Sequence, residues 1–360
     1  MVVGLNTKRV TEHDAQARVE FLAYASGSVF PHFFIMLFWR LVVGISIVLF
    51  VLGLCYVDVC VSQYGLAREI VWLPRGIVLI PPYLVCLFFL TKEFLGILDT
   101  AGLHPRRSTV YGGILLIAVS CWLANVVQQY QVDILHETIS RRGWQWASTA
   151  SVCALLAVAA GIILSFAAEM RRFTHPGGAT INLAGAVFAI AYLGLLSCFM
   201  IQLHMAYEIG ALLSLVLVVK LSDTGAYAVG KLFGRHKITP GLSPGKTLEG
   251  CIGGILFACI GAWFWFAIAL PYYDSIKPNE VLFPRTPTLN WLFFSITVSL
   301  AGMVGDLAGS LIKRDTQLKD SGHTVPGFGG ILDIFDSLLM AAPVVYVFWA
   351  TGIVCPGYHL

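Results

Sequence analysis

Charged residues are scarce in this 360-residue sequence, where Asp, Glu, Lys and Arg together supply 12% of the chain, about half the share typical of soluble domains. Hydrophobic residues supply 58%, and the mean hydropathy is +0.80. Runs of about 20 apolar residues, each long enough to cross a bilayer as a helix, leave no length for a large water-soluble domain. Because a spanning segment must satisfy its own backbone hydrogen bonds, we predict an all-α, polytopic membrane bundle.

Paired cysteines and a complete nucleotide-binding loop motif are also missing. None of the nine cysteines forms a CxxC pair, and most lie inside apolar runs, which is typical of small buried hydrophobes rather than of metal or disulfide sites. The segment Ser243–Thr247 reads SPGKT, but Pro240 stands where a P-loop needs glycine. This excludes a P-loop nucleotidase.

The apolar runs predict nine membrane spans. With the N-terminus in the cytoplasm, 17 of the 23 Lys and Arg residues fall in cytoplasmic segments, as the positive-inside rule requires. We expect 1–38 to be a cytoplasmic segment, either an amphipathic surface helix or a disordered tail, 39–200 a transmembrane scaffold, and 201–360 the catalytic region. The predicted spans are Trp39–Val57, Ile77–Leu98, Val110–Val127, Trp146–Ala167, Ile181–Ile201, Ile209–Leu221, Cys251–Leu270, Trp291–Val304 and Leu338–Val354.

One stretch near the C-terminal end, Ser310–Asp336, departs from this apolar composition, and we call it the signature stretch. It mixes Lys, Arg, Asp, Ser and His between two apolar runs. If the eighth span continues as a helix to Leu318, then Asp306, Ser310 and Lys313 share one helix face. Such a face could hold a metal ion and a phosphate together.

The carboxylates in and beside the signature stretch predict a site for a hard cation. Mg²⁺ prefers a few protein carboxylates together with phosphate oxygens and water. Charges at membrane depth are costly, which favours a functional role for Asp306 and Asp320. Asp333 and Asp336, one helical turn apart, either bind metal or cap the last span, whereas an ion pair is the better interpretation of Asp315.

A second polar stretch, Ser222–Gly254, is rich in glycine and basic residues and begins with an aspartate, Asp223. This composition is typical of a loop whose backbone N–H groups approach anions. The alternative is a solvated basic loop. The predicted topology puts this stretch and the signature stretch on the cytoplasmic face, which favours one shared phosphate site.

Three further polar residues have weaker claims on this site. His323 could be an acid, a base or a phosphate ligand, but a single loop histidine is more often a hydrogen-bonding residue. Glu93 and Asn182 head or close predicted spans on the cytoplasmic side and could line the same pocket. We leave the role of Glu93 open.

Together these motifs resemble the phosphatidate cytidylyltransferase family, which makes CDP-diacylglycerol. Phe328 and Ile334 stand where the family usually has histidine and arginine. The signature residues that match are Ser310, Lys313, Arg314, Lys319, Asp320, Gly322, Pro326, Gly327, Gly329, Gly330, Asp333 and Asp336. Upstream, Asp223, Gly225, Ala226, Tyr227, Gly230, Lys231, Phe233, Gly234, His236, Lys237, Ser243, Pro244, Gly245, Lys246, Thr247 and Gly254 follow in family-like order.

The resemblance implies that CTP and phosphatidate give CDP-diacylglycerol and pyrophosphate, with Mg²⁺, with or without a second cation, as cofactor. It also implies a homodimer, membrane lipid as partner, no nucleic acid, and a bacterial-type inner membrane with the site facing the cytoplasm. We expect four catalytic residues: Lys313, Arg314, Lys319 and Asp320. Substrate would contact Asp223, Lys231, Ser243, Gly245, Lys246, Thr247, Ser310 and His323, and metal would contact Asp306, Asp320, Asp333 and Asp336.

Two rival functions stay open at this point. A CTP-dependent kinase of polyprenol or phytol would also combine a membrane bundle with a nucleotide. A transporter with an ion path along Asp306 and Lys220 is the other, but transporters usually show broken helices in both halves, and here the polar residues gather in the second half.

Overall fold

A computed structural model describes most of the chain. The chain divides into two compact units, residues 1–53 with 325–328 and residues 54–324 with 329–360. Of the first unit only residues 49–53 are described, and they are helical; every contact discussed below lies within the second unit. The described residues are 49–61, 76–134, 144–271, 288–318, 320–322, 324 and 329–354. Their side chains are described as well, except at residues 128–149 and 288.

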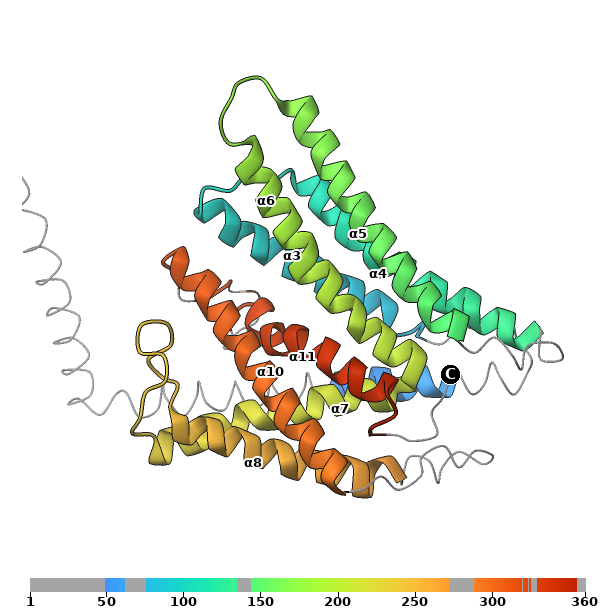
Figure 1. Ribbon diagram of the computed structural model, residues 1–360, viewed down its shortest axis with the longest axis vertical. Helices are drawn as coiled ribbons and strands as arrows, with labels where there is room; N and C mark the ends of the chain where they lie inside the picture. The colour runs from blue at the N-terminus through green and yellow to red at the C-terminus, as the bar shows by residue number, and fades with distance from the viewer. Residues whose placement is uncertain are drawn as a thin grey trace, which may run out of the picture. The chain divides into compact units, whose positions relative to one another are not determined.

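The described part of the chain is helical and contains no β-strand, so the predicted all-α class is confirmed. Seven helical stretches are long and apolar enough to cross a membrane, and a shorter apolar helix covers Leu49–Val61. The labelled elements are α3 (Ile80–Thr100), α4 (Arg107–Ile134), α5 (Trp144–Arg172), α6 (Ala179–Ala189), η1 (Ile190–Leu195), α7 (Leu196–Phe233), α8 (Leu248–Phe264), η2 (Trp265–Ala269), α10 (Thr288–Asp315) and α11 (Leu332–Ala350), shown in Figure 1.

The predicted fifth and sixth spans correspond to the two helices on either side of a kink in one helical stretch, Ala179–Phe233. That stretch bends inside α7, where Tyr207 (φ −121°, ψ 17°) and Glu208 (φ 61°, ψ −177°) leave the helical conformation. A positive φ is costly for a residue with a side chain, so the surrounding packing must hold this break in place. Most of the predicted first span lies outside the described residues, and the count of nine stays a prediction.

The prediction that residues 222–254 form a loop is wrong at both ends. Helix α7 continues to Phe233 and α8 begins at Leu248, leaving a connection of residues 234–247. Several glycines of this stretch therefore lie on helices. An added Cβ at Gly225 would come 2.5 Å from the Phe257 ring, and one at Gly250 would come 2.9 Å from a backbone oxygen of α7. These small residues let the two helices approach closely, as is common between membrane helices.

Two hydrophobic cores meet at α11. The first core joins α3, α4, α5, η1 and the start of α7, and it includes Leu332 and Leu339 of α11. The second joins the rest of α7 to α8 and α10, and it includes Leu338 and Val345 of α11. Successive faces of α11 therefore pack against both groups, and its N-terminal end lies where α3, α7 and α10 come together (Figure 1).

Candidate active site

One face of α10 carries the polar residues that the sequence grouped together. Helix α10 includes Asp306, Ser310 and Lys313 and ends at Asp315, slightly before the Leu318 that we expected. The chain leaves the helix through Gln317, whose φ is +58°, while the Leu318 N–H donates to the Lys313 carbonyl at 2.8 Å. This left-handed ending turns the chain back toward the start of α11.

The connection between α7 and α8 reaches α10 through Lys246. The Lys246 ammonium lies 2.8 Å from the Asp306 carboxylate and donates to the Met303 carbonyl at 3.3 Å. Backbone pairing between Lys237 and Thr247 closes the base of this connection, and the Thr247 hydroxyl accepts from Gly250 N at 3.1 Å. The second polar stretch is thus in direct contact with α10, the helix that leads into the signature stretch.

Two more carboxylates flank Asp306. Asp223 of α7 pairs with Lys220 at 3.1 Å, and Lys220 also donates to the Ile334 carbonyl of α11 at 2.9 Å. Asp336 is 3% exposed and lies against α10, where an added Cβ at Gly309 would come 2.7 Å from its Oδ2. Asp306 is close enough to interact electrostatically with both.

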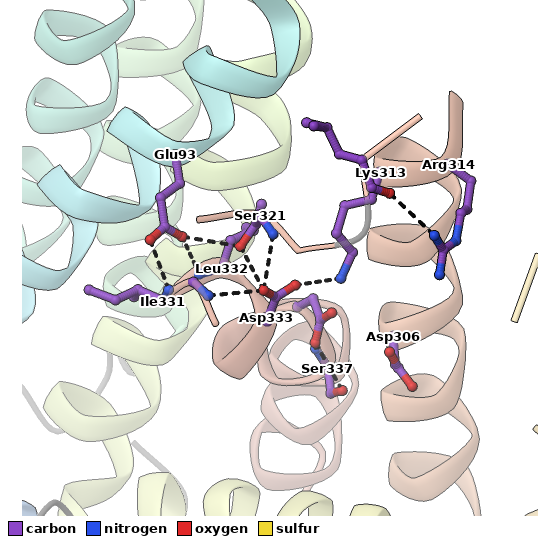
Figure 2. A network of polar contacts seen from close by, with 12 residues as sticks. Glu93, Asp306, Lys313, Arg314, Ser321, Ile331, Leu332, Asp333 and Ser337 are labelled. Atoms are coloured by element: carbon purple, nitrogen blue, oxygen red, sulfur yellow. Dashed lines mark hydrogen bonds and ion pairs between the residues drawn. The ribbon is translucent and has the colours of Figure 1, made fainter. Parts of the chain in front are cut away.

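Asp333 organises the remainder of the signature stretch. Its Oδ1 forms an ion pair with Lys313, and its Oδ2 accepts from Ser321 N at 3.1 Å, Ser321 Oγ at 2.9 Å and Gly330 N at 3.0 Å. Both charged side chains are more than four-fifths buried. The bond back to Gly330 resembles the reciprocal half of a capping box, so Asp333 holds the loop before α11 as well as the lysine (Figure 2).

Glu93 of α3 is the site residue to which the sequence gave no role. It is 8% exposed, and its carboxylate points at the start of α11 (Figure 2). Oε1 accepts from Thr324 Oγ1 at 2.5 Å and Ile331 N at 3.0 Å, and Oε2 accepts from Leu332 N at 2.9 Å. Oε2 also lies 3.2 Å from Ser321 Oγ, whose single proton it shares with Asp333. The only available signal in the sequence was an acid next to an apolar run, where an unpartnered charge is expensive.

The other predicted residues take up varied positions. Arg314 is exposed and its guanidinium lies 3.5 Å from the Leu318 carbonyl. Lys231 lies over the Tyr227 ring, 5.6 Å from its centre. Asp320 is exposed, and no hydrogen bond or ion pair links it to another described residue. Lys319, His323 and Phe328 fall outside the described residues. Among the described residues, no hydrogen bond joins the side chain of Ser243 or Ser310 to the site, and Gly245 has only its backbone to offer.

The donor set fits a magnesium ion that draws most of its ligands from substrate. In the part of the chain that the structure describes, no three His, Cys, Asp or Glu residues form a complete metal cage. Asp306, however, keeps 44% of its side chain exposed with two further carboxylates near it. Mg²⁺ commonly binds one or two carboxylates and completes its shell with phosphate oxygens and water. A site that supplies only part of the ligands is therefore chemically suitable.

Three acids of the site are each paired with a lysine. Lys220, Lys246 and Lys313 neutralise Asp223, Asp306 and Asp333. A ligand that carries both phosphates and a divalent cation can satisfy both kinds of partner at once, since phosphates attract the lysines and the cation attracts the carboxylates. The chemistry therefore favours a metal-bound polyphosphate over a simple anion or a simple cation.

Comparison with known proteins agrees with this chemistry. The model of a family described as the cytidylyltransferase family matches residues 30–351. A phosphatidate cytidylyltransferase of Staphylococcus aureus (strain COL) is 33% identical over 205 residues, which cover 56% of this chain and 70% of that protein. One from Staphylococcus haemolyticus is 34% identical over 206 residues with the same coverage, and one from Staphylococcus epidermidis is 31% identical over 206 residues.

Proposed function

The chain belongs to the cytidylyltransferase family, and we propose that the Lys246–Asp306 contact marks its active site. The protein is an integral membrane enzyme of phospholipid biosynthesis that makes CDP-diacylglycerol and pyrophosphate from CTP and phosphatidate. The Lys246–Asp306 ion pair, 2.8 Å long, carries the proposal for the site because it joins the polar stretch between α7 and α8 to the helix that leads into the signature stretch.

The reaction needs positioning more than proton transfer. A phosphate oxygen of phosphatidate attacks the α-phosphorus of CTP, the bond from that phosphorus to the oxygen bridging the α- and β-phosphates breaks, and pyrophosphate leaves with the electron pair. The attacking phosphate is already an anion at neutral pH, so no strong general base is required. Catalysis then depends on alignment and on neutralising the charge that gathers on the leaving pyrophosphate.

We assign that neutralisation to the lysines. Lys246 and Lys313 leave their carboxylate partners and donate to triphosphate oxygens, with Lys319 and Arg314 beside them. The backbone of Ser243 and Gly245 approaches a phosphate in the same connection. Lys231, Ser310 and His323 complete the proposed substrate contacts, together with Asp223 and Thr247, whose hydroxyl already caps α8.

Asp306 and Asp320 are the proposed metal ligands, with Asp333 and Asp336 as further candidates. A Mg²⁺ ion held by these carboxylates would supply Lewis-acid stabilisation of the charge on the triphosphate. The exposed face of Asp306 leaves room for such a ligand. A second cation near Asp336 belongs to the same proposal, and the observation that supports it is the proximity of Asp306 and Asp336.

We further propose that the site faces the cytoplasm, that the membrane is a bacterial-type inner membrane, and that the enzyme is a homodimer. The excess of Lys and Arg in the segments predicted to be cytoplasmic supports the orientation. Cysteine labelling from either side of a sealed membrane, at an Asp315→Cys variant, tests it. Chemical cross-linking of the detergent-purified enzyme tests the dimer.

The activity itself is tested with purified protein in detergent, CTP, phosphatidate and Mg²⁺. We expect equal amounts of pyrophosphate and CDP-diacylglycerol, full loss of both with EDTA, and recovery with excess Mg²⁺. CTP labelled on its γ-phosphate separates the rival function, because a lipid kinase would transfer that label to the lipid. No product from the parent protein would overturn the assignment, and activity that survives EDTA would overturn the metal proposal alone.

A further inference from the structure

The Glu93 carboxylate is the point where the N-terminal scaffold holds the signature stretch. Two hydroxyls and two backbone N–H groups from that stretch converge on it, one of each kind at each carboxylate oxygen, and the Ser321 hydroxyl shares its proton between Glu93 and Asp333 (Figure 2). The N-terminal residue of α11 has no capping side chain of its own. Glu93, more than 200 positions earlier in the chain, supplies that cap from another helix.

Small residues make this contact possible. An added Cβ at Gly322 would lie 2.8 Å from Glu93 Oε1, and one at Gly330 would come closer still to Oε2. Both glycines belong to the signature stretch. The chain here is shaped around the carboxylate, which is negative at the end of α11 where the helix dipole favours negative charge.

The same hydrogen-bonded chain continues to the proposed catalytic lysine. Ser321 Oγ lies 3.2 Å from Glu93 Oε2 and 2.9 Å from Asp333 Oδ2, and the other oxygen of Asp333 pairs with Lys313. Three links therefore connect a scaffold helix to Lys313. In Figure 2 the Glu93 carboxylate points toward the loop before α11 rather than toward Asp306.

We propose that Glu93 is a positioning residue for cytidylyl transfer: it fixes the loop before α11 so that Asp333 presents Lys313 to the triphosphate. This inference rests on the proposed function, since it names how one part of that same site is held. It also predicts that loss of Glu93 weakens the binding of CTP and not that of phosphatidate. The reason is that Lys313 is assigned to CTP, whereas the loop is not assigned to the acyl chains of phosphatidate.

Glu93→Gln tests the inference with little change in volume. The amide has one carbonyl oxygen, so whichever way it sits, one backbone N–H and one hydroxyl of the loop face an NH₂ group that cannot accept. Loss of a residue that orients a ligating group typically costs about 10–100-fold. We expect the KM for CTP to rise about tenfold and kcat to fall, while the KM for phosphatidate stays within about twofold of the parent.

Hydrogen exchange gives a second readout on the same variant. The amides of Ile331 and Leu332 should exchange faster in Glu93→Gln, with the exchange of α8 unchanged. A purely structural role predicts a different pattern, in which specific activity falls with the folded fraction and both KM values keep their parental size. That pattern, or an unchanged KM for CTP in a folded variant, would overturn the inference.

Asp99→Asn is the matched control. Asp99 lies on the same helix but is partly exposed and pairs with Arg107 and His104, so its loss should leave both KM values within about twofold, as for surface ion pairs. If Glu93→Gln fails to fold, Thr324→Ala removes one donor to the same carboxylate without touching the charge. It should raise the KM for CTP about threefold, the effect of roughly one net hydrogen bond at the lower end of the usual range, and a parental KM would overturn the inference.

Failure of this inference is distinguishable from failure of the proposed function. A parent protein that forms no CDP-diacylglycerol contradicts the proposed site, whereas an active parent with an unaltered Glu93→Gln variant contradicts only the positioning role. CTP binding by calorimetry, measured with both proteins, reports on the loop independently of turnover. A weaker affinity in the variant supports the inference, and equal affinities contradict it.

Discussion

Two carboxylates of the site occupy opposite surroundings. Glu93 is 8% exposed and has four donor groups of the protein within hydrogen-bond distance, of which the Ser321 hydroxyl is shared with Asp333, whereas Asp306 has a side chain 44% exposed and pairs with Lys246. A carboxylate has about four lone-pair positions, so Glu93 has none left for a ligand and Asp306 has several. Burial with full pairing marks the residue that holds the site, and partial exposure marks the residue that is available to substrate.

Of these two carboxylates, the more exposed one, Asp306, should matter more for activity. Asp306→Asn keeps the size of the side chain but removes the charge proposed to bind metal, and we expect CDP-diacylglycerol formation to fall about 100-fold or more, as when one electrostatic contact to a transition state is removed. The unfolding temperature in detergent should stay near that of the parent. A loss of stability with little loss of activity would reverse the assignment.

Asp315→Asn is the control for that experiment. Asp315 is an exposed acid at the end of the same helix and has no assigned role in the reaction. Its activity should remain within about twofold of the parent, the range expected when an exposed charge is removed. A loss comparable to that of Asp306→Asn would show that the effect belongs to the charge of the helix end rather than to the site.

Asp333→Asn should lower both activity and stability, because Asp333 is mostly buried, as Glu93 is, and pairs with a lysine, as Asp306 does. It leaves the Lys313 ammonium, 12% exposed, without its partner, and breaking a buried pair costs about 3 kcal/mol of stability. Activity should fall about 10–100-fold as the lysine loses its orientation. Thermal unfolding and steady-state kinetics on one preparation measure the two losses together, and an effect on only one of them would contradict this intermediate position.

Lys246→Met should act on nucleotide binding alone. The change keeps the length of the side chain and removes the charge, so the KM for CTP should rise about tenfold, the worth of one charge-assisted hydrogen bond. The KM for phosphatidate serves as the internal control. Equal changes in the two KM values would contradict this assignment, because they would show that Lys246 contributes to the binding of both substrates.

Thr247→Ala should give the smallest effect. Its hydroxyl caps α8 by accepting from Gly250 N at 3.1 Å, and the residue is 3% exposed, so it resembles Glu93 more than Asp306. Losing such a cap costs about 1 kcal/mol, measured as a lower unfolding temperature. A Thr247→Ser variant should recover most of that loss, and a large rise in the KM for CTP with Thr247→Ala would identify the hydroxyl, rather than the backbone of Thr247, as the group that contacts substrate.

The sequence predicted the parts of this molecule that depend on local composition. Apolar length identified the helical membrane bundle, and residue spacing identified the face of α10 that carries Asp306 and Lys313. It misassigned the glycines of residues 222–254, because a glycine that allows helices to approach and a glycine that forms an anion-binding turn look the same along the chain. Contacts between helices, such as those of Gly225 with Phe257 and of Gly250 with α7, separate the two roles.

Glu93 could not be assigned from the sequence for a related reason. Its role depends on donors more than 200 positions away, and no local pattern records that pairing. Asp306 was easier, since it lies near other polar residues of its own helix. Residues that contact substrate tend to stand in recognisable groups, whereas a residue that holds the group in place can come from any helix that packs against it.

The distance along the chain between Glu93 and its donors has a consequence for biosynthesis. Ribosomes add about 5–20 residues per second, so the 238 positions between Glu93 and Ile331 take roughly 10–50 s to synthesise. Throughout that interval α3 is already made while the four donors to its carboxylate do not yet exist. The nascent protein therefore carries an unsatisfied acid until α11 is added, and conditions that slow translation or insertion of α11 should expose that intermediate to quality-control proteases.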